Sequence, residues 1–206
     1  MTVKHGRAIL LNMSIETTKD KIIKTAFEFT SKFGLESLTI GELAKAVGMS
    51  KSGLFGHFKS KEKLQMMVLD FSAENFTHKV IKPALLRPRG IPRLEGMVEG
   101  WVKWSTSTHS GGCPIVAAAI EFDDRPGNIR DRIQELLQLM MATYAKAAQI
   151  AVDEGQLKAD LDTEQFAYEL YSLMMGHHVY NRLLADKNAK NRLNVAFEGL
   201  VGRYKV

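Results

Sequence analysis

Residues 39–64 read TIGELAKAVGMSKSGLFGHFKSKEKL, and this stretch decides the fold of the N-terminal part of the chain. Thr39 and Ser50 each precede a short helical pattern, and both residue types accept hydrogen bonds at helix N-termini. Gly48 supplies a tight turn between the two helices, and Ala44 is small enough to let them cross closely. The spacing predicts a helix-turn-helix whose second helix is free to enter a major groove of DNA.

The second helix of this motif carries mostly small or polar residues, so its backbone can approach DNA closely. Hydroxyl groups and helix N-terminal amides suit phosphate oxygens, and the lysines that follow the helix can add phosphate contacts. We therefore expect a DNA-binding surface formed by Thr39, Ser50, Lys51, Ser52, Gly53, Phe55, His57 and Lys61.

The positive charge of the chain is concentrated in its first third. Residues 1–64 hold 11 Lys and Arg against six Asp and Glu, whereas residues 65–206 hold 17 of each. The whole net charge of +5 therefore lies in the segment that contains the helix-turn-helix. A basic segment joined to a neutral one indicates a polyanionic partner for the first segment only.

The rest of the sequence is patterned as helices and shows no alternation typical of strands. Apolar periodicity, caps and Gly or Pro breaks predict an all-α protein of about nine helices. Their approximate ranges are 18–33, 40–47, 51–57, 61–82, 92–108, 114–122, 128–154, 163–185 and 189–204. The helix that starts at residue 61 is expected to end at Pro83, because proline cannot donate the next helical hydrogen bond.

At these residues the chain resembles the TetR family of transcription regulators. The strict resemblance covers about residues 18–64, and the length and helical layout are similar over nearly the whole chain. The matching positions are Thr39, Leu43, Ala44, Gly48, Met49, Ser50, Ser52, Leu54, His57, Phe58, Ser60, Lys61, Glu62 and Leu64. Phe55 and Gly56 depart from the pattern, which usually has Tyr and then a large polar residue, so the Tyr hydroxyl contact to phosphate is lost.

The resemblance implies a helix-turn-helix domain at 14–64 and a regulatory and dimerisation domain at 65–206. The segment Gly112-Cys113-Pro114, followed by EFDDRPG at 121–127, is similar to one TetR subgroup. The implied activity is that of a homodimeric repressor, bound to double-stranded operator DNA and released by an unknown small molecule. Two recognition helices would meet half-sites about one turn apart, roughly 34–36 Å.

The resemblance also places the ligand and the second subunit in the C-terminal part. Aromatic, Met and His side chains can line an adaptable apolar cavity, although each of them can equally fill a helical core. The expected ligand-binding residues are Trp101, Trp104, His109, Cys113, Phe122, Met141, Tyr144, Tyr171, Met174, Met175 and His178. The last two helices would pair with their copies through Leu173, His177, Tyr180, Leu184, Phe197 and Leu200, or else form intramolecular core.

Two alternatives stay open at this point. Cys113 precedes Pro114 at a predicted helix N-terminus, where the helix dipole favours a thiolate, so the chain could instead sense oxidants or electrophiles. The departures at Phe55 and Gly56 would also suit a helical adaptor that no longer binds DNA.

The sequence contains no motif that indicates another class of function. No nucleophile or phosphate-loop motif is present, and the His and Cys spacing matches no zinc pattern, so we expect no enzyme activity, cofactor or metal. A single cysteine and the absence of an apolar run of about 18 residues lead us to expect a cytoplasmic protein without membrane contact.

Overall fold

The computed structural model describes residues 17–107 and 111–206, and this part of the chain is all-α, as predicted. Its elements are α1 (Thr18–Phe33), α2 (Ile40–Val47), α3 (Lys51–Phe58), α4 (Lys61–Phe76), η1 (Thr77–Ile81), α5 (Lys82–Leu85), α6 (Ile91–Ser107), α7 (Pro114–Glu121), α8 (Asn128–Asp153), α9 (Thr163–Arg182) and α10 (Ala189–Tyr204). Since α4, η1 and α5 follow one another without a break, the described residues form nine continuous helices.

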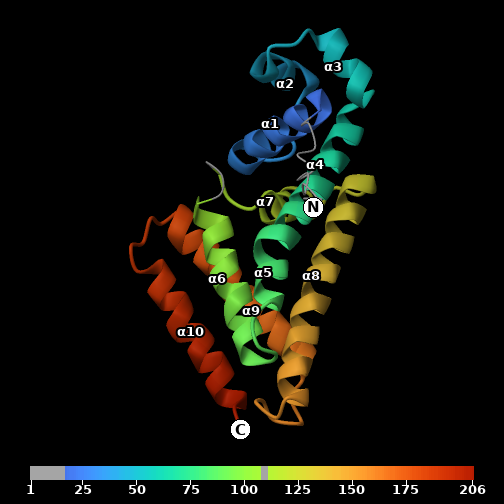
Figure 1. The fold of residues 1–206 in the computed structure, drawn as a ribbon. Helices are drawn as coiled ribbons and strands as arrows, with labels where there is room; N and C mark the ends of the chain where they lie inside the picture. Colours follow the sequence, from blue (N-terminus) through green and yellow to red (C-terminus); the bar gives the residue numbers. More distant parts are fainter. Residues whose placement is uncertain (1–16, 108–110) are drawn as a thin grey trace, which may run out of the picture.

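The first three helices form a small module at one end of the molecule (Figure 1). Helix α1 starts with a capping box, in which the Thr17 hydroxyl accepts from the Asp20 amide and the Asp20 carboxylate accepts from the Thr17 amide. Apolar side chains from all three helices meet inside the module, among them the fully buried Leu43 and Leu54. Each such leucine contributes about 1.5–3 kcal/mol by leaving water, so short helices become stable through packing.

One long helical rod joins this module to the rest of the chain. It starts with α4 and continues through the π-helical turn η1 into α5, so the expected end at Pro83 is wrong. Pro83 lies in the first turn of α5, directly after the π turn, where a missing N–H group is tolerated. The rod therefore carries the N-terminal module and the C-terminal part on one continuous helix.

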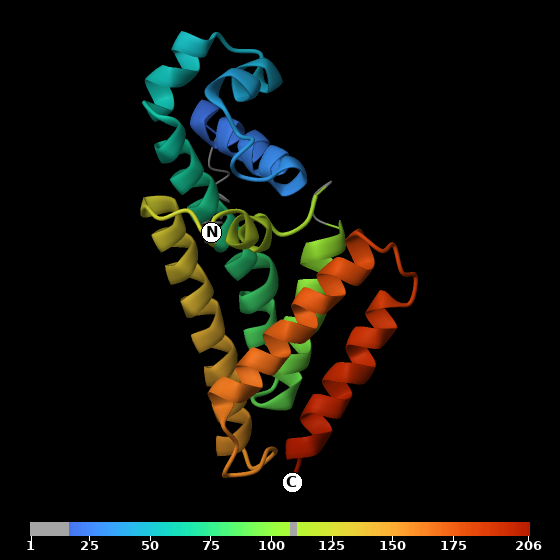
Figure 2. The same ribbon diagram turned by 180° about the vertical axis from the view of Figure 1, so that it is seen from behind.

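The C-terminal helices surround the lower part of this rod (Figure 1). Figure 2 shows α9 crossing the back of the domain, with α10 returning beside it as an antiparallel neighbour. Trp104 on α6 lies in the core that joins the two parts. The centroid of its ring is 5.9 Å from that of Phe27 on α1 and 5.8 Å from that of Phe76 on α4. None of the helices in the described ranges has the length and apolar character needed to cross a bilayer.

Candidate functional site

The geometry of the helix-turn-helix follows from its caps and its buried side chains. The Thr39 hydroxyl accepts from the Glu42 amide at 3.1 Å, and the Ser50 hydroxyl accepts from the Gly53 amide at 3.1 Å. Gly48 takes the left-handed conformation (φ 69°) that ends α2, as its position in the sequence predicts. Leu54, buried from the inner face of α3, fixes this helix against the module and leaves its other face to solvent.

The residues expected to contact DNA lie on that outer face. The exposed positions are Thr39, Ser50, Lys51, Ser52, Gly53, Phe55, Gly56 and His57. A Cβ built on Gly56 meets no atom within 4 Å, so the helix backbone is open to close approach at this point. The arrangement gives a capped helix N-terminus, hydroxyl groups and a bare stretch of backbone on one surface, which together suit a phosphate-lined groove.

Lys61 is placed differently from the other cationic residues. Its ammonium group donates to the Glu36 carbonyl at 2.7 Å and to the Glu36 carboxylate at 3.0 Å, and this contact lowers the pKa of Glu36. The side chain thereby ties the start of α4 to the turn between α1 and α2. Lys59 and Lys63 are exposed on either side of it and extend the positive surface beyond α3.

Most of the expected ligand-binding residues lie in the core between α6, α7, α8 and α9. Trp101, Trp104, Cys113, Phe122, Tyr144 and Met174 are buried there, while Met141, Tyr171, Met175 and His178 are half-buried at its edge. His109 lies outside the described residues. Burial raises the pKa of Tyr171 to about 12 and that of Tyr144 still further.

Several polar atoms in this core have no hydrogen-bond partner among the described residues. They are the Trp101 indole nitrogen, the Tyr144 hydroxyl and the Nδ1 atom of His178. A buried polar group left unpaired costs free energy, and such groups frequently mark a place where water or a ligand enters. The described residues, 17–107 and 111–206, contain no cluster of three His, Cys, Asp or Glu side chains of the kind that holds a metal ion.

Cys113 does not have the environment of a reactive thiol. Hydrogen bonds from Trp104 and from the first backbone amides of α7 favour the thiolate, as the sequence predicts. Burial outweighs them, however, and raises the pKa of Cys113 above its ordinary value. The alternative of a thiol sensor therefore finds no support, because desolvation inside the core exceeds the effect of the helix terminus.

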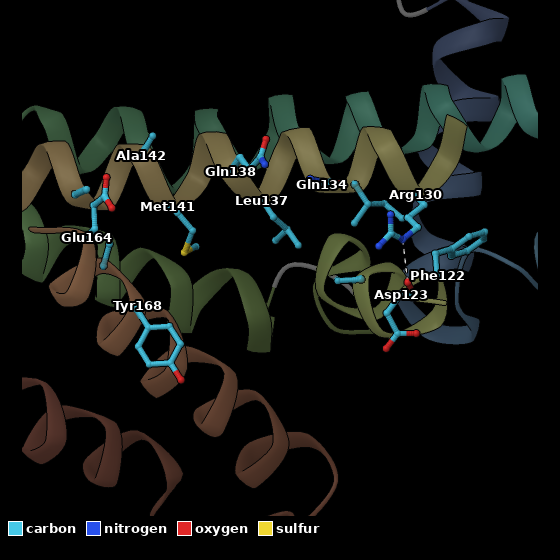
Figure 3. A pocket seen from close by; sticks show the side chains of 14 residues that line it. Phe122, Asp123, Arg130, Gln134, Leu137, Gln138, Met141, Ala142, Glu164 and Tyr168 are labelled. Atoms are coloured by element: carbon cyan, nitrogen blue, oxygen red, sulfur yellow. Dashed lines mark hydrogen bonds between the residues drawn. The ribbon is translucent and has the colours of Figure 1, made fainter. Parts of the chain in front are cut away.

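An open cavity of about 650 Å³ lies between α7, α8 and α9. Of the expected ligand-binding residues, Phe122 and Met141 line it. The sequence did not single out the other lining side chains, which include Arg130, Gln134, Leu137, Gln138, Glu164 and Tyr168. On a helix, polar residues such as these look like ordinary solvated surface, and only the packing of α8 against α7 and α9 brings them around one space (Figure 3).

The segment that forms one wall of this cavity also holds the DNA-binding module. One Glu121 carboxylate oxygen accepts from the Leu35 amide at 2.8 Å and from the Glu36 amide at 3.2 Å, in the turn between α1 and α2. Nearby, Arg125 pairs with the Glu36 carboxylate at 3.7 Å. The carboxyl end of α7 is thus bonded to the module through a carboxylate and a guanidinium.

Two further bonds reach α4 from the start of α8. Asn128 donates to the Glu62 carboxylate at 2.7 Å, and Arg132 pairs with Asp70 at 2.7 Å. All five of these contacts come from residues 121–132, which also supply part of the cavity wall.

The residues expected at a dimer interface divide into two groups. Tyr180 of α9 and Leu184, which lies just beyond the end of that helix, are exposed, and Leu173 is half-buried. In contrast, His177, Phe197 and Leu200 are buried within the single chain, between α9 and its neighbours. The exposed apolar face continues through Val179 and Leu183 of α9 and Val195 of α10. Gly176 and Gly199 on this face have no atom within 4 Å of a built Cβ.

A capped helix-turn-helix mounted on a larger helical domain defines the chain as a DNA-binding transcription regulator. Residues 22–65 match the family model described as bacterial regulatory proteins, tetR family. Residues 90–197 match the model of the tetracyclin repressor-like C-terminal domain. Since this second match alone covers more than half of the chain, the protein belongs to the TetR family.

Curated relatives match the chain over a little more than a quarter of its length or less. It is 42% identical over 52 residues to the HTH-type transcriptional regulator QacR of Staphylococcus aureus, which is 25% of this chain and 28% of that protein. It is 32% identical over 60 residues to AcrR of Shigella flexneri, 29% of this chain and 28% of that protein. The matches therefore span less than a third of the length of these relatives.

Solved structures resemble the chain over nearly its full length. A TetR transcriptional regulator from Chloroflexus aurantiacus superposes with a TM-score of 0.79 at 22% identity, covering 89% of this chain and 92% of the other. A TetR-family regulator from Cytophaga hutchinsonii gives a TM-score of 0.80 at 17% identity, covering 92% and 95%. At such identities the likeness shows the fold.

Proposed function

We propose that the protein is a homodimeric repressor that acts in the cytoplasm, binds a near-palindromic operator through α3, and leaves it when a small effector binds. The observation that carries the proposal is the outer face of α3. Its capped N-terminus, exposed hydroxyls and open Gly56 backbone form a surface that fits the major groove. Lys51, Lys59 and Lys63 surround that face with positive charge.

Phe55 is the most unusual member of this surface, since 54% of its side chain is exposed on a helix that should meet DNA. A phenyl ring cannot donate to phosphate, but it can pack against the methyl group of thymine. Phe55 therefore supports a role in base recognition, where a tyrosine would instead serve in backbone contact.

The apolar face of α9 and α10 supports the homodimer. Exposed apolar side chains and small glycines along two antiparallel helices favour packing against a copy of the same face. A two-fold dimer presents two α3 helices, and two-fold symmetry in the protein matches near-palindromic symmetry in the operator.

The bonds from residues 121–132 to the turn between α1 and α2 and to α4 support a response to an effector. A ligand can change the population of the DNA-binding arrangement only by binding two arrangements with different affinity. The wall of the cavity is bonded directly to the DNA-binding module, so a ligand that reshapes the wall also changes those bonds. Such a ligand would bind the two arrangements with different affinity.

The test is binding of the purified protein to the upstream region of its own gene, compared with random DNA, at several salt concentrations. A specific complex should prefer the upstream region and lose affinity steeply with salt, because bound lysines release counterions from DNA. The variants Lys51→Gln and Lys59→Gln should weaken binding to both DNAs and each lower the salt slope by about one.

Lys187→Gln is the matched control, because Lys187 is an exposed lysine in the turn between α9 and α10, remote from α3. It should leave affinity and salt slope unchanged. Equal binding to both DNAs with no salt dependence would contradict the proposal and favour the helical adaptor.

A further inference from the structure

We propose that the cavity between α7, α8 and α9 is the effector site, and that it takes an amphipathic organic anion with one carboxylate bound to Arg130. The inference rests on the proposed function, since it names the site and the chemical class of the effector. Three features of the cavity carry it: a guanidinium without an ion pair among the described residues at one end, an apolar middle, and Glu164 at the other end.

Arg130 supplies the anion-binding group. Its Nε atom donates to the backbone carbonyl of Asp123 at 2.8 Å, which fixes the side chain across the end of the cavity (Figure 3). No ion pair to Arg130 is found in the described part of the chain, whereas its neighbours Arg125 and Arg132 both have one. The Asp123 carboxylate also lines this end of the cavity, and one of its oxygens accepts from the Asp124 amide. The guanidinium therefore keeps donors in the planar arrangement that binds a carboxylate.

The middle of the cavity is apolar, and its far end is acidic. Leu137, Met141 and Ala142 line the α8 side, and a space of about 650 Å³ suits a small organic molecule. Glu164 lies toward the opposite end from Arg130, as Figure 3 shows. Among the described residues, Glu164 has no cationic lining residue beside it, whereas the Asp123 carboxylate at the other end lies beside the Arg130 guanidinium. The ligand therefore has its single negative charge at the Arg130 end and an apolar body along α8.

One short segment, residues 122–125, connects the cavity to the DNA-binding module. The Phe122 ring lines the cavity and also packs under the Arg125 guanidinium, 5.5 Å from its centroid. Arg125 in turn pairs with Glu36. A ligand carboxylate that competes with the Asp123 carbonyl for Arg130 loosens the turn after α7, and with it the contacts that position α1 and α2.

The first experiment measures binding by titration calorimetry with two probes, decanoate and 4-phenylbutyrate. Each is compared with the alcohol and the amine that have the same apolar part. We expect both carboxylates to bind at least about tenfold more tightly than the matched alcohol or amine, which is the usual effect of one charge-assisted hydrogen bond. Arg130→Gln should remove this preference, and Ala142→Phe, which fills the cavity from an exposed position, should weaken every probe.

Lys146→Gln is the matched control, because it removes one positive charge from an exposed position on α8 that does not line the cavity. It should bind the carboxylates as the unmodified protein does. Equal affinity for carboxylate and alcohol, or unchanged carboxylate binding in Arg130→Gln, overturns the proposal.

The second experiment adds the better carboxylate to the complex with the upstream DNA. We expect it to weaken DNA binding at least tenfold in the unmodified protein and in Lys146→Gln, but not in Arg130→Gln. Tight carboxylate binding with unchanged DNA affinity overturns the effector role of the cavity. If the protein binds no DNA even without probe, the proposed function fails, and the calorimetric comparison still decides which class of ligand the cavity takes.

Discussion

The two parts of the molecule place their functional groups in opposite ways. The helix-turn-helix holds its candidate residues on the outside, on a helix fixed from within by Leu54. The C-terminal domain buries most of its candidates in a core, including Trp101 and Tyr144. A DNA surface has to be rigid and presented before its partner arrives, whereas a ligand site can be formed from side chains that otherwise fill the interior. The DNA-binding surface can therefore be recognised from the spacing of residues in the sequence, whereas the ligand site can be recognised only from the packing of the helices.

The largest effect is expected where the C-terminal domain controls the DNA-binding part through dimer formation. The double variant Tyr180→Glu with Leu184→Glu places charges on the exposed apolar face of α9. Loss of the dimer should lower operator affinity by about hundredfold, because the two half-sites then bind independently. Sedimentation together with DNA titration measures both effects.

Leu86→Glu is the control for this variant. Leu86 is 90% exposed at the end of α5, away from the α9–α10 face, so a charge there should change neither mass nor affinity. If the double variant stays dimeric at micromolar concentration, the interface lies elsewhere.

The next largest effect tests the junction between the two parts. Gly111 lies where a Cβ would collide with the Ser31 carbonyl of α1, and the adjacent Gly112 amide donates to that same carbonyl at 2.9 Å. Gly111→Ala should lower the free energy of unfolding by about 2–3 kcal/mol, because backbone atoms on both sides have to move. Urea unfolding measures the change, and an unchanged midpoint would show that the junction is not closely packed.

Local interactions were predicted well from the sequence, and long-range ones poorly. Thr39 and Ser50 cap helices as predicted, because a side-chain oxygen near its own backbone amides needs no distant partner. The sequence left the environment of Cys113 open, because the pKa of its thiol depends on burial by other helices. Arg130 was missed for a similar reason, since nothing near it in sequence shows that α9 forms the opposite wall of a cavity.

The acid stability of the C-terminal domain should depend on two histidines of α9. Burial lowers the pKa of His177 and of His178, and Arg182 lowers that of His178 further, so both take up protons less readily in the folded chain. Below about pH 6.5 the unfolded chain takes up protons that the folded chain does not. Stability is therefore retained above this value and lost as the pH falls, by up to about 1.4 kcal/mol per pH unit for each histidine.

Urea unfolding at pH 7.5 and 5.5 measures this dependence. The variant His177→Asn with His178→Gln should lose less stability between the two values than the unmodified protein. His78→Gln, at an exposed position on η1, should keep the original dependence. Identical slopes in all three proteins would show that the α9 histidines are not responsible.

The smallest effect separates stability from function in the DNA-binding module. A Cβ on Gly56 meets no atom within 4 Å, and alanine favours a helix over glycine, so Gly56→Ala should raise the free energy of unfolding by up to about 1 kcal/mol. If α3 lies with its backbone against the groove, the same methyl group should weaken DNA binding. Urea unfolding and DNA titration on one preparation therefore give opposite signs. A variant that gains stability and keeps its full affinity would place Gly56 outside the DNA contact and leave Ser50 to Gly53 as the part of α3 that meets the bases.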